Sequence, residues 1–166
     1  KAGKNKKVLI EFIRKRSAEE CYRILCEKSE IPVFLMTGDS SILDRKRMIR
    51  KIEALDSVIL VATQVVEAGV DIDMDIGYKD ISRLDSEEQF MGRINRSGRK
   101  SGIVYFFDLD NVEKIYSGDK RIEKDKTLVN KEMRELLTAK NFPAYYENGI
   151  LPLVLAEKKK CNDENI

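Results

Sequence analysis

The chain has 166 residues, of which 42% are hydrophobic and 36% are charged, and this composition suits a globular domain with a sizeable core. The net charge of +2 does not by itself indicate a nucleic-acid partner. No run approaches the roughly 18 apolar residues of a membrane span, and three cysteines without any histidine argue against a zinc site. We therefore expect a cytoplasmic protein without a metal site of its own, cut from a longer chain because it begins without Met in a basic run.

Short apolar runs alternate with helical patterns along the first two thirds of the chain. These runs predict strands over 8–13, 33–36, 58–62, 74–78 and 103–109. Ser17 with Glu20, and Ser41 with Asp44, have the spacing of a capping box and predict where the first two helices begin. Strands that alternate with helices imply right-handed crossovers and a mostly parallel sheet, so the sequence predicts an α/β fold.

The stretch 85–99, DSEEQFMGRINRSGR, predicts a helix with two different faces. Asp85 or Ser86 can cap this helix, because Glu or Gln follows three residues later. At 3.6 residues per turn, one face would carry an amide, a glycine and two guanidinium groups: Gln89, Gly92, Arg93 and Arg96. The opposite face would anchor the helix to a core through Phe90, Met91 and Ile94. Such a helix suits an anion, and the alternative is a solvated Arg-rich surface helix.

A second stretch, SVILVATQVVEAGVDID over 57–73, begins with a strand expected to be buried on both faces. The loop that follows a buried parallel strand lies at the edge where such sheets bind ligands. In this loop Thr63 offers a hydroxyl and Gly69 allows close backbone approach. Asp71 can accept a hydrogen bond from a ribose hydroxyl or orient an arginine.

Beyond residue 110 the pattern weakens. The polar stretch 111–126 predicts a connector, Thr127 can cap a following helix, and the charged end of the chain predicts a frayed tail. We therefore expect one domain over 1–110, and a connector, helix and tail over 111–166 that begin a following region.

The two stretches together resemble a known family. ATQVVEAGVDID followed by LDSEEQFMGRINRSGR resembles motifs V and VI of superfamily 2 helicases, and is most similar to the CRISPR-associated helicase-nuclease of type I systems. The resemblance runs from about Val8 to about Leu137. It implies the second RecA-like domain of a helicase, a three-layer sandwich around a mostly parallel sheet, followed by a helical C-terminal extension.

The resemblance also implies roles at a nucleotide. Arg96 would be the arginine finger, Arg93 would assist at the γ-phosphate, and Gln89 would place that phosphate or the attacking water. Asp71 would contact the ribose or Arg93. Gly69 and Gly92 are, with Asp71, the residues expected to bind the nucleotide cofactor.

Nucleic-acid contacts are expected from other residues. By resemblance, Thr63 would meet a DNA backbone phosphate, a kind of contact that positions the strand without reading its sequence. Thr37 and Gly38 end the second predicted strand and are further candidates. Arg45 is another candidate, although an arginine in the first turn of a helix is more often simply solvated.

Half of an ATPase site is missing from the sequence. No G-x-x-x-x-G-K-[ST] and no Asp-Glu pair after an apolar strand is present, so Walker A and Walker B are absent. ATP and Mg²⁺ would be held mainly by the first RecA-like domain of the parent chain, and we expect the isolated chain to be inactive. By resemblance, the further partners are single-stranded DNA and a CRISPR surveillance complex with its guide RNA.

Two other interpretations of the function of this chain stay open. One is the C-terminal domain of a general superfamily 2 DNA or RNA helicase. The other is a non-catalytic module of the same fold that serves as a docking or DNA-binding surface. A docking surface has no need of the set formed by Gln89, Gly92, Arg93 and Arg96, which speaks against the second of these interpretations.

Overall fold

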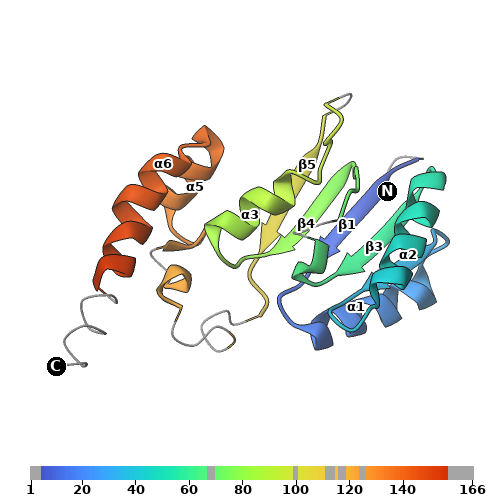
Figure 1. Ribbon diagram of the computed structural model, residues 1–166. Helices are drawn as coiled ribbons and strands as arrows, with labels where there is room; N and C mark the ends of the chain where they lie inside the picture. The colour runs from blue at the N-terminus through green and yellow to red at the C-terminus, as the bar shows by residue number, and fades with distance from the viewer. Residues whose placement is uncertain are drawn as a thin grey trace. The chain divides into compact units, whose positions relative to one another are not determined.

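The structure is a computed structural model, which describes residues 5–66, 70–98, 101–110, 115, 119–123 and 126–156 (Figure 1). The chain divides into two compact units, one formed by 1–81 with 85–111 and the other by 82–84 with 112–166. The sheet belongs to the first unit and the C-terminal helices to the second. No helix in the described ranges is long and apolar enough to cross a bilayer.

A five-stranded sheet forms the centre of the first unit, with strand order β2-β3-β1-β4-β5 (Figure 1). Every pair of neighbouring strands is parallel, as the alternation of strands and helices predicts. The strands are β1 (Lys7–Glu11), β2 (Val33–Met36), β3 (Val58–Ala62), β4 (Ile76–Asp80) and β5 (Ile103–Phe107).

Helices cover both faces of this sheet, which confirms the predicted three-layer arrangement. On one face, α2 (Ile42–Ala54) and α3 (Leu84–Met91) share a core with Leu9 of β1. On the other face, α1 (Lys15–Lys28) shares a core with Ile10. Successive residues of a strand point to opposite faces, so β1 contributes to both cores.

The predicted start of α1 is wrong by three residues. The helix begins at Lys15 with Arg14 at the N-cap, so Ser17 lies inside the first turn. The reason is that Asp110 supplies the acceptor instead: its carboxylate accepts from Arg14 N–H at 3.1 Å and from Ser17 Oγ at 2.9 Å. The prediction for α2 is confirmed, because the side chain of Ser41 accepts from Asp44 N–H.

The predicted helix over 85–99 is shorter in the structure. It begins at Leu84, so Asp85 and Ser86 lie in the first turn rather than at the cap, and it ends at Met91. The next two bonds are of the tighter three-residue type, from Arg93 N–H to Phe90 O and from Ile94 N–H to Met91 O. The helix therefore does not carry all four predicted polar residues on one face.

Three strands also have limits that differ from the prediction: β1 spans 7–11 rather than 8–13, β4 spans 76–80 rather than 74–78, and β5 spans 103–107 rather than 103–109. β4 begins at Ile76, because Met74 forms an isolated parallel bridge with Ile94 ahead of the strand. β5 ends at Phe107, because the next free N–H groups, those of Leu109 and Asp110, donate to the carboxylate of Asp80.

Gly77 allows α3 to lie close against the sheet. A Cβ at this position would be 2.6 Å from Phe90 Cε1 and 2.9 Å from Ile94 Cδ1. Both side chains are buried, so neither can turn out into solvent without emptying the core. Close contact here fixes where the end of α3 and the turn after it sit on the sheet.

The second unit is helical, as predicted, although its helices begin elsewhere. Asn130, not Thr127, caps α5 (Lys131–Ala139). Asn141 caps α6 (Phe142–Tyr145), which runs into the π-helical segment η4 (Tyr146–Ile150) and further helical residues to 156. The short helix η2 (Lys120–Ile122) lies within the predicted connector, and the predicted tail over 157–166 lies outside the described residues.

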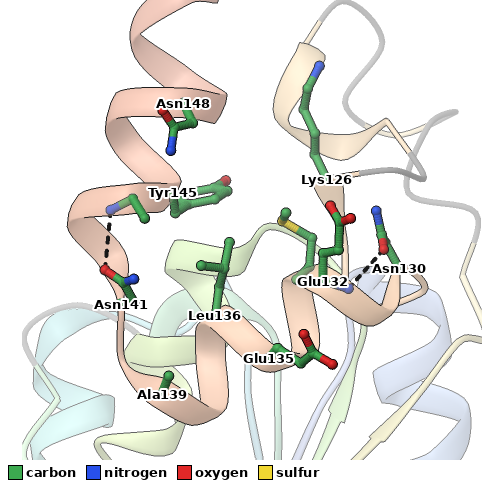
Figure 2. Close-up of a pocket in the computed structure, with 11 residues that line it drawn as sticks. Lys126, Asn130, Glu132, Glu135, Leu136, Ala139, Asn141, Tyr145 and Asn148 are labelled. Atoms are coloured by element: carbon green, nitrogen blue, oxygen red, sulfur yellow. Dashed lines mark hydrogen bonds between the residues drawn. The ribbon is translucent and has the colours of Figure 1, made fainter.

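A cavity of about 620 Å³ lies between the helices of this second unit. Tyr145 projects from α6 toward Leu136 of α5 and forms part of its wall (Figure 2). The two capping asparagines, Asn130 and Asn141, lie at its rim with their hydrogen bonds to backbone N–H groups (Figure 2). The side chains that line this cavity are therefore partly committed to holding the helix ends.

Candidate functional site

An extended segment over 70–74 lies on the sheet face that α2 and α3 cover. Val70, Ile72 and Met74 are buried in that core, whereas Asp71 and Asp73 are exposed. This strict alternation places both carboxylates on the same, outward side of the segment.

The turn after α3, which carries Arg93 and Arg96, is joined to this segment by backbone hydrogen bonds. Met74 N–H donates to Arg93 O at 3.0 Å, and Asn95 N–H donates to Met74 O at 2.7 Å. Asn95 takes the left-handed conformation, with φ of 49°, which asparagine tolerates better than most residues. The turn after α3 is thus held like a short strand beside the two carboxylates.

Both carboxylates bind this turn at the position of Arg96. Asp71 Oδ1 lies 3.1 Å from Arg96 Nη1, in an ion pair whose side chains are 85% and 45% exposed. Asp73 accepts from the backbone N–H of Arg96 at 2.8 Å and from that of Ser97 at 3.3 Å. Asp71 therefore orients the guanidinium of Arg96, and Asp73 orients its backbone.

Arg93 is held in a different way. Its Nε donates to the carbonyl oxygen of Val66 at 3.1 Å, in the short helix η1 (Gln64–Val66) that follows β3. Burial, and then the nearby charge of Arg96, lower the pKa of Arg93, while the carboxylate of Asp71 raises it in part. The two guanidinium groups are thus close enough to repel each other, an arrangement that an added anion would relieve.

The sequence of this region matches a known family. A family model described as CRISPR-associated nuclease/helicase Cas3, C-terminal, matches residues 4–99, which is more than half of the chain. The chain belongs to this Cas3 C-terminal family. It is the C-terminal domain of a superfamily 2 helicase, as the two motifs predict.

Curated relatives include both Cas3 proteins and RNA helicases. The CRISPR-associated nuclease/helicase Cas3 of Haloferax volcanii is 36% identical over 83 residues, which are 46% of this chain and 9% of that protein. The putative Cas3 of Methanocaldococcus jannaschii is 25% identical over 147 residues, 82% of this chain and 19% of that protein. The ATP-dependent RNA helicase DDX42 of Xenopus laevis is 30% identical over 134 residues, 78% of this chain and 14% of that protein. The chain thus spans less than a fifth of the length of these relatives.

Solved structures show the same fold. The crystal structure of T. fusca Cas3 matches with a TM-score of 0.55 and 17% identity, over 67% of this chain and 16% of that one. Domain 2 of the DEAD-box helicase Mss116p matches with a TM-score of 0.56 and 23% identity, over 64% of this chain and 43% of that one. The C-terminal domain of the DEAD-box protein Dbp5 matches with a TM-score of 0.55 and 21% identity, over 68% of this chain and 67% of that one. This Cas3-like domain therefore has the RecA-like α/β fold that the sequence predicts.

Asp71, Asp73, Arg93 and Arg96 lie together, and we call this set the Arg96 corner. Not every residue predicted for the nucleotide site lies in it. Gln89 is exposed near the end of α3, and Gly92 is the first residue after the helix and is also exposed. A Cβ on Gly92 would lie 3.3 Å from the carbonyl oxygen of Gln89, a tight contact with the helix itself. Gly69 lies outside the described residues.

The four candidate nucleic-acid residues gather at the carboxyl ends of β2 and β3. Thr37 and Thr63 follow these neighbouring strands, and both are buried. Arg45 points back to this loop, where its Nη2 donates to the carbonyl oxygens of Thr37 and Gly38 at 3.3 and 3.1 Å. Gly38 is exposed, and a Cβ there would meet no atom within 4 Å. The structure thus gives Arg45 a supporting contact to the loop that the sequence does not predict.

Asp73 and the buried charges beside β4 are further residues that the motifs do not single out. The ammonium of Lys79 forms an ion pair with Glu11, its register neighbour on β1, and lies 3.5 Å from Glu87 Oε2 of α3. All three side chains are buried, and the ring centroid of Phe90 lies 5.6 Å from the ammonium nitrogen of Lys79. The period-2 alternation of 70–74 could have revealed Asp73, but no local pattern links Lys79 to Glu87.

The described residues contain no group of three or more His, Cys, Asp or Glu side chains that could hold a metal ion.

Proposed function

We propose that this chain is the second motor domain of an ATP-dependent translocase that moves on single-stranded DNA in type I CRISPR interference. The observation that carries the proposal is the Arg96 corner, where Asp71 and Arg93 lie near the finger candidate. Arginine forks donate to phosphate oxygens, and an exposed carboxylate can accept from a ribose hydroxyl. This donor set fits the phosphates and sugar of a nucleotide.

In this proposal each candidate residue of the nucleotide site has its own task. Arg96 stabilises the charge that develops on the γ-phosphate, an effect worth about three to five decades in rate for arginine fingers. Arg93 assists at the same phosphate, and Gln89 orients the phosphate or the attacking water. Asp71 contacts the ribose or orients an arginine, while Gly69 and Gly92 allow close approach. Bound ATP would supply the phosphoryl group, Mg²⁺ would neutralise its oxygens, and both would be held mainly by a first RecA-like domain of the parent chain.

The DNA side of the proposal rests on the carboxyl ends of β2 and β3. Thr63, Thr37 and Gly38 would meet backbone phosphates, with Arg45 fixing their loop through the two carbonyl bonds described above. A cytoplasmic CRISPR surveillance complex with its guide RNA would present the DNA.

A second candidate function is a general superfamily 2 helicase that acts on RNA. The match to the RNA helicase DDX42 favours it, because that match extends over 78% of the chain at 30% identity. Stimulation of ATP hydrolysis by RNA but not by single-stranded DNA would favour this candidate.

The test is nucleic-acid-stimulated ATP hydrolysis by the full-length protein in Mg²⁺, for the unaltered protein, Arg96→Ala and the control Arg23→Ala. Arg23 is an exposed arginine of α1, outside the Arg96 corner. We expect Arg96→Ala to lose two decades or more while circular dichroism stays unchanged, and Arg23→Ala to lose little. Unchanged turnover in Arg96→Ala would overturn the proposal and favour a docking module. Robust hydrolysis by the isolated chain would contradict the assignment of a half-site.

A further inference from the structure

The outward face of α2 is basic. The helix carries five basic residues and two acidic ones. At 100° per residue, Arg47 and Arg50 fall opposite the buried side of the helix, with Lys46 and Lys51 flanking them. All four are exposed. We call this set, with Leu43, the outer face of α2.

Few of these charges are neutralised within the domain. In the described ranges, Arg47 lies 3.8 Å from Asp44, whereas no ion pair involves Lys46, Arg50 or Lys51. The helix α1 provides a comparison within the same unit, because its basic residues alternate with acids. There, Lys15 pairs with Glu19 at 3.5 Å and Arg23 with Glu27 at 3.4 Å. Among the residues that the structure describes, the outer face of α2 therefore carries more unpaired positive charge than α1 does.

Two large apolar side chains stand at the amino end of this basic face. Ile42 and Leu43 are 74% and 59% exposed, although they occupy the first turn of a helix that has an apolar side of its own. They follow the loop of Gly38, which presents open space where a side chain would be. Cations next to exposed aliphatic groups suit a ligand that is itself charged along one side and apolar along the other.

We infer that the outer face of α2, with Ile42, binds single-stranded DNA and extends the contact surface at the carboxyl ends of β2 and β3. Proteins that hold single strands combine a basic groove along the backbone with aromatic side chains on which the bases stack. Here the aliphatic side chains of Ile42 and Leu43 would contact the base faces instead. Charge complementarity to phosphates and direct continuity with the loop of Gly38 identify this occupant. The step from Leu43 to Arg50 is about 10 Å along the helix, so the face can follow a strand beyond the loop. This inference rests on the proposed function and adds a path for the strand.

The test is binding of a fluorescein-labelled oligodeoxythymidine to the full-length protein by anisotropy over a series of salt concentrations. The variant Lys46→Gln/Arg50→Gln/Lys51→Gln removes the three cations without ion pairs. The control Arg16→Gln/Arg23→Gln/Lys28→Gln removes the same charge from exposed positions of α1. A third variant, Ile42→Ser/Leu43→Ser, removes the apolar groups and no basic residue. Circular dichroism verifies that each variant is folded.

We expect the slope of log K against log salt to become shallower by about 2 for the α2 variant, since each lost single-strand phosphate contact removes about 0.7. Its Kd at low salt should rise roughly tenfold or more. The α1 control should keep the slope of the unaltered protein. Ile42→Ser/Leu43→Ser should weaken binding with the slope unchanged, because apolar contacts release no counterions.

Three outcomes would overturn the inference. An unchanged slope in the α2 variant would mean that this face contacts no phosphates. An equal change in the α1 control would mean that the face only adds general charge. A loss confined to a labelled RNA of the same length would mean that another nucleic acid occupies it. If the unaltered protein binds no single-stranded DNA, the proposed function fails first, and this result is distinct from a variant that binds like the unaltered protein.

Discussion

Asp73 holds Arg96 by the backbone, since its Oδ1 accepts from the N–H of Arg96 at 2.8 Å across 23 positions of sequence. The second oxygen accepts from Ser97, so one carboxylate orders two successive peptide groups. The side chain of Arg96 stays available for its pair with Asp71. An arginine held in this way is ordered at its backbone while its guanidinium remains partly exposed.

The first prediction concerns this carboxylate. In the full-length protein, Asp73→Ala should lower kcat for ATP hydrolysis by about tenfold to a hundredfold with KM for ATP nearly unchanged, because a misplacement of about 1 Å can cost two decades. Steady-state kinetics measure the two constants. Asp73→Asn, which keeps one acceptor, should be intermediate, and Asp108→Ala, at an exposed carboxylate, should change neither. A raised KM with normal kcat would show instead that Asp73 acts in nucleotide binding.

The second prediction concerns Gly77. Gly77→Ala should lower the free energy of unfolding by about 1 to 3 kcal/mol, because the added methyl group must displace Phe90 or Ile94. Gly38→Ala is the control and should change stability by less than about 0.5 kcal/mol, since its Cβ meets nothing. Urea unfolding measures both. Equal midpoints for the two variants would mean that α3 moves away from the sheet at little cost.

The third prediction concerns the buried charges. Lys79→Met should destabilise the domain by about 3 to 5 kcal/mol, because Glu11 and Glu87 would then face each other without a cation. Replacing all three, as Lys79→Met/Glu11→Leu/Glu87→Leu, should recover much of this loss, since no buried charge remains. Thermal unfolding compares the variants. A triple variant less stable than Lys79→Met would show that the carboxylates stabilise the fold by themselves.

The fourth prediction concerns pH. Burial raises the pKa of Asp80 to about 6, although hydrogen bonds from the N–H groups of Leu109 and Asp110 act in the opposite direction. The folded protein then holds this proton more tightly than the unfolded chain. The stability that this group contributes is therefore fully present below pH 3.8 and is lost as the pH rises toward 6. Its size is on the order of 3 kcal/mol.

Asp80→Asn removes this titration, so its free energy of unfolding should vary less between pH 4 and pH 6.5 than that of the unaltered domain. Urea unfolding at a series of pH values measures the difference. If both proteins lose stability equally over this interval, another group is responsible for the loss.

Local signals predicted those parts of the fold that local interactions determine. The limits of β2 and β3 agree with the apolar runs, and Ser41 caps α2 because its acceptor and donor are three residues apart. The start of α1 was missed because its acceptor is the carboxylate of Asp110, 96 positions from Arg14. The end of α3 was missed for the same reason, since Met74 captures the peptide groups that a longer helix would use.

The candidate site was accessible from sequence only through its motifs. The resemblance to helicase motifs V and VI indicates Asp71, Arg93 and Arg96, and the structure brings these three together. Helical periodicity alone placed Gln89 and Arg96 on one face, which is wrong because the helix ends between them. Lys79 and Glu11 meet only through the register of β1 with β4, which the sequence does not display.

The tight fit at Gly77 has a consequence for protein engineering. The stretch 85–99 cannot be replaced by itself, because two of its side chains, Phe90 and Ile94, pack directly against the backbone of Gly77. A chimera that takes this stretch from another helicase must therefore take the matching residue of β4 as well. Between homologues, we expect the size of the residue at position 77 to vary inversely with that of the residues at 90 and 94.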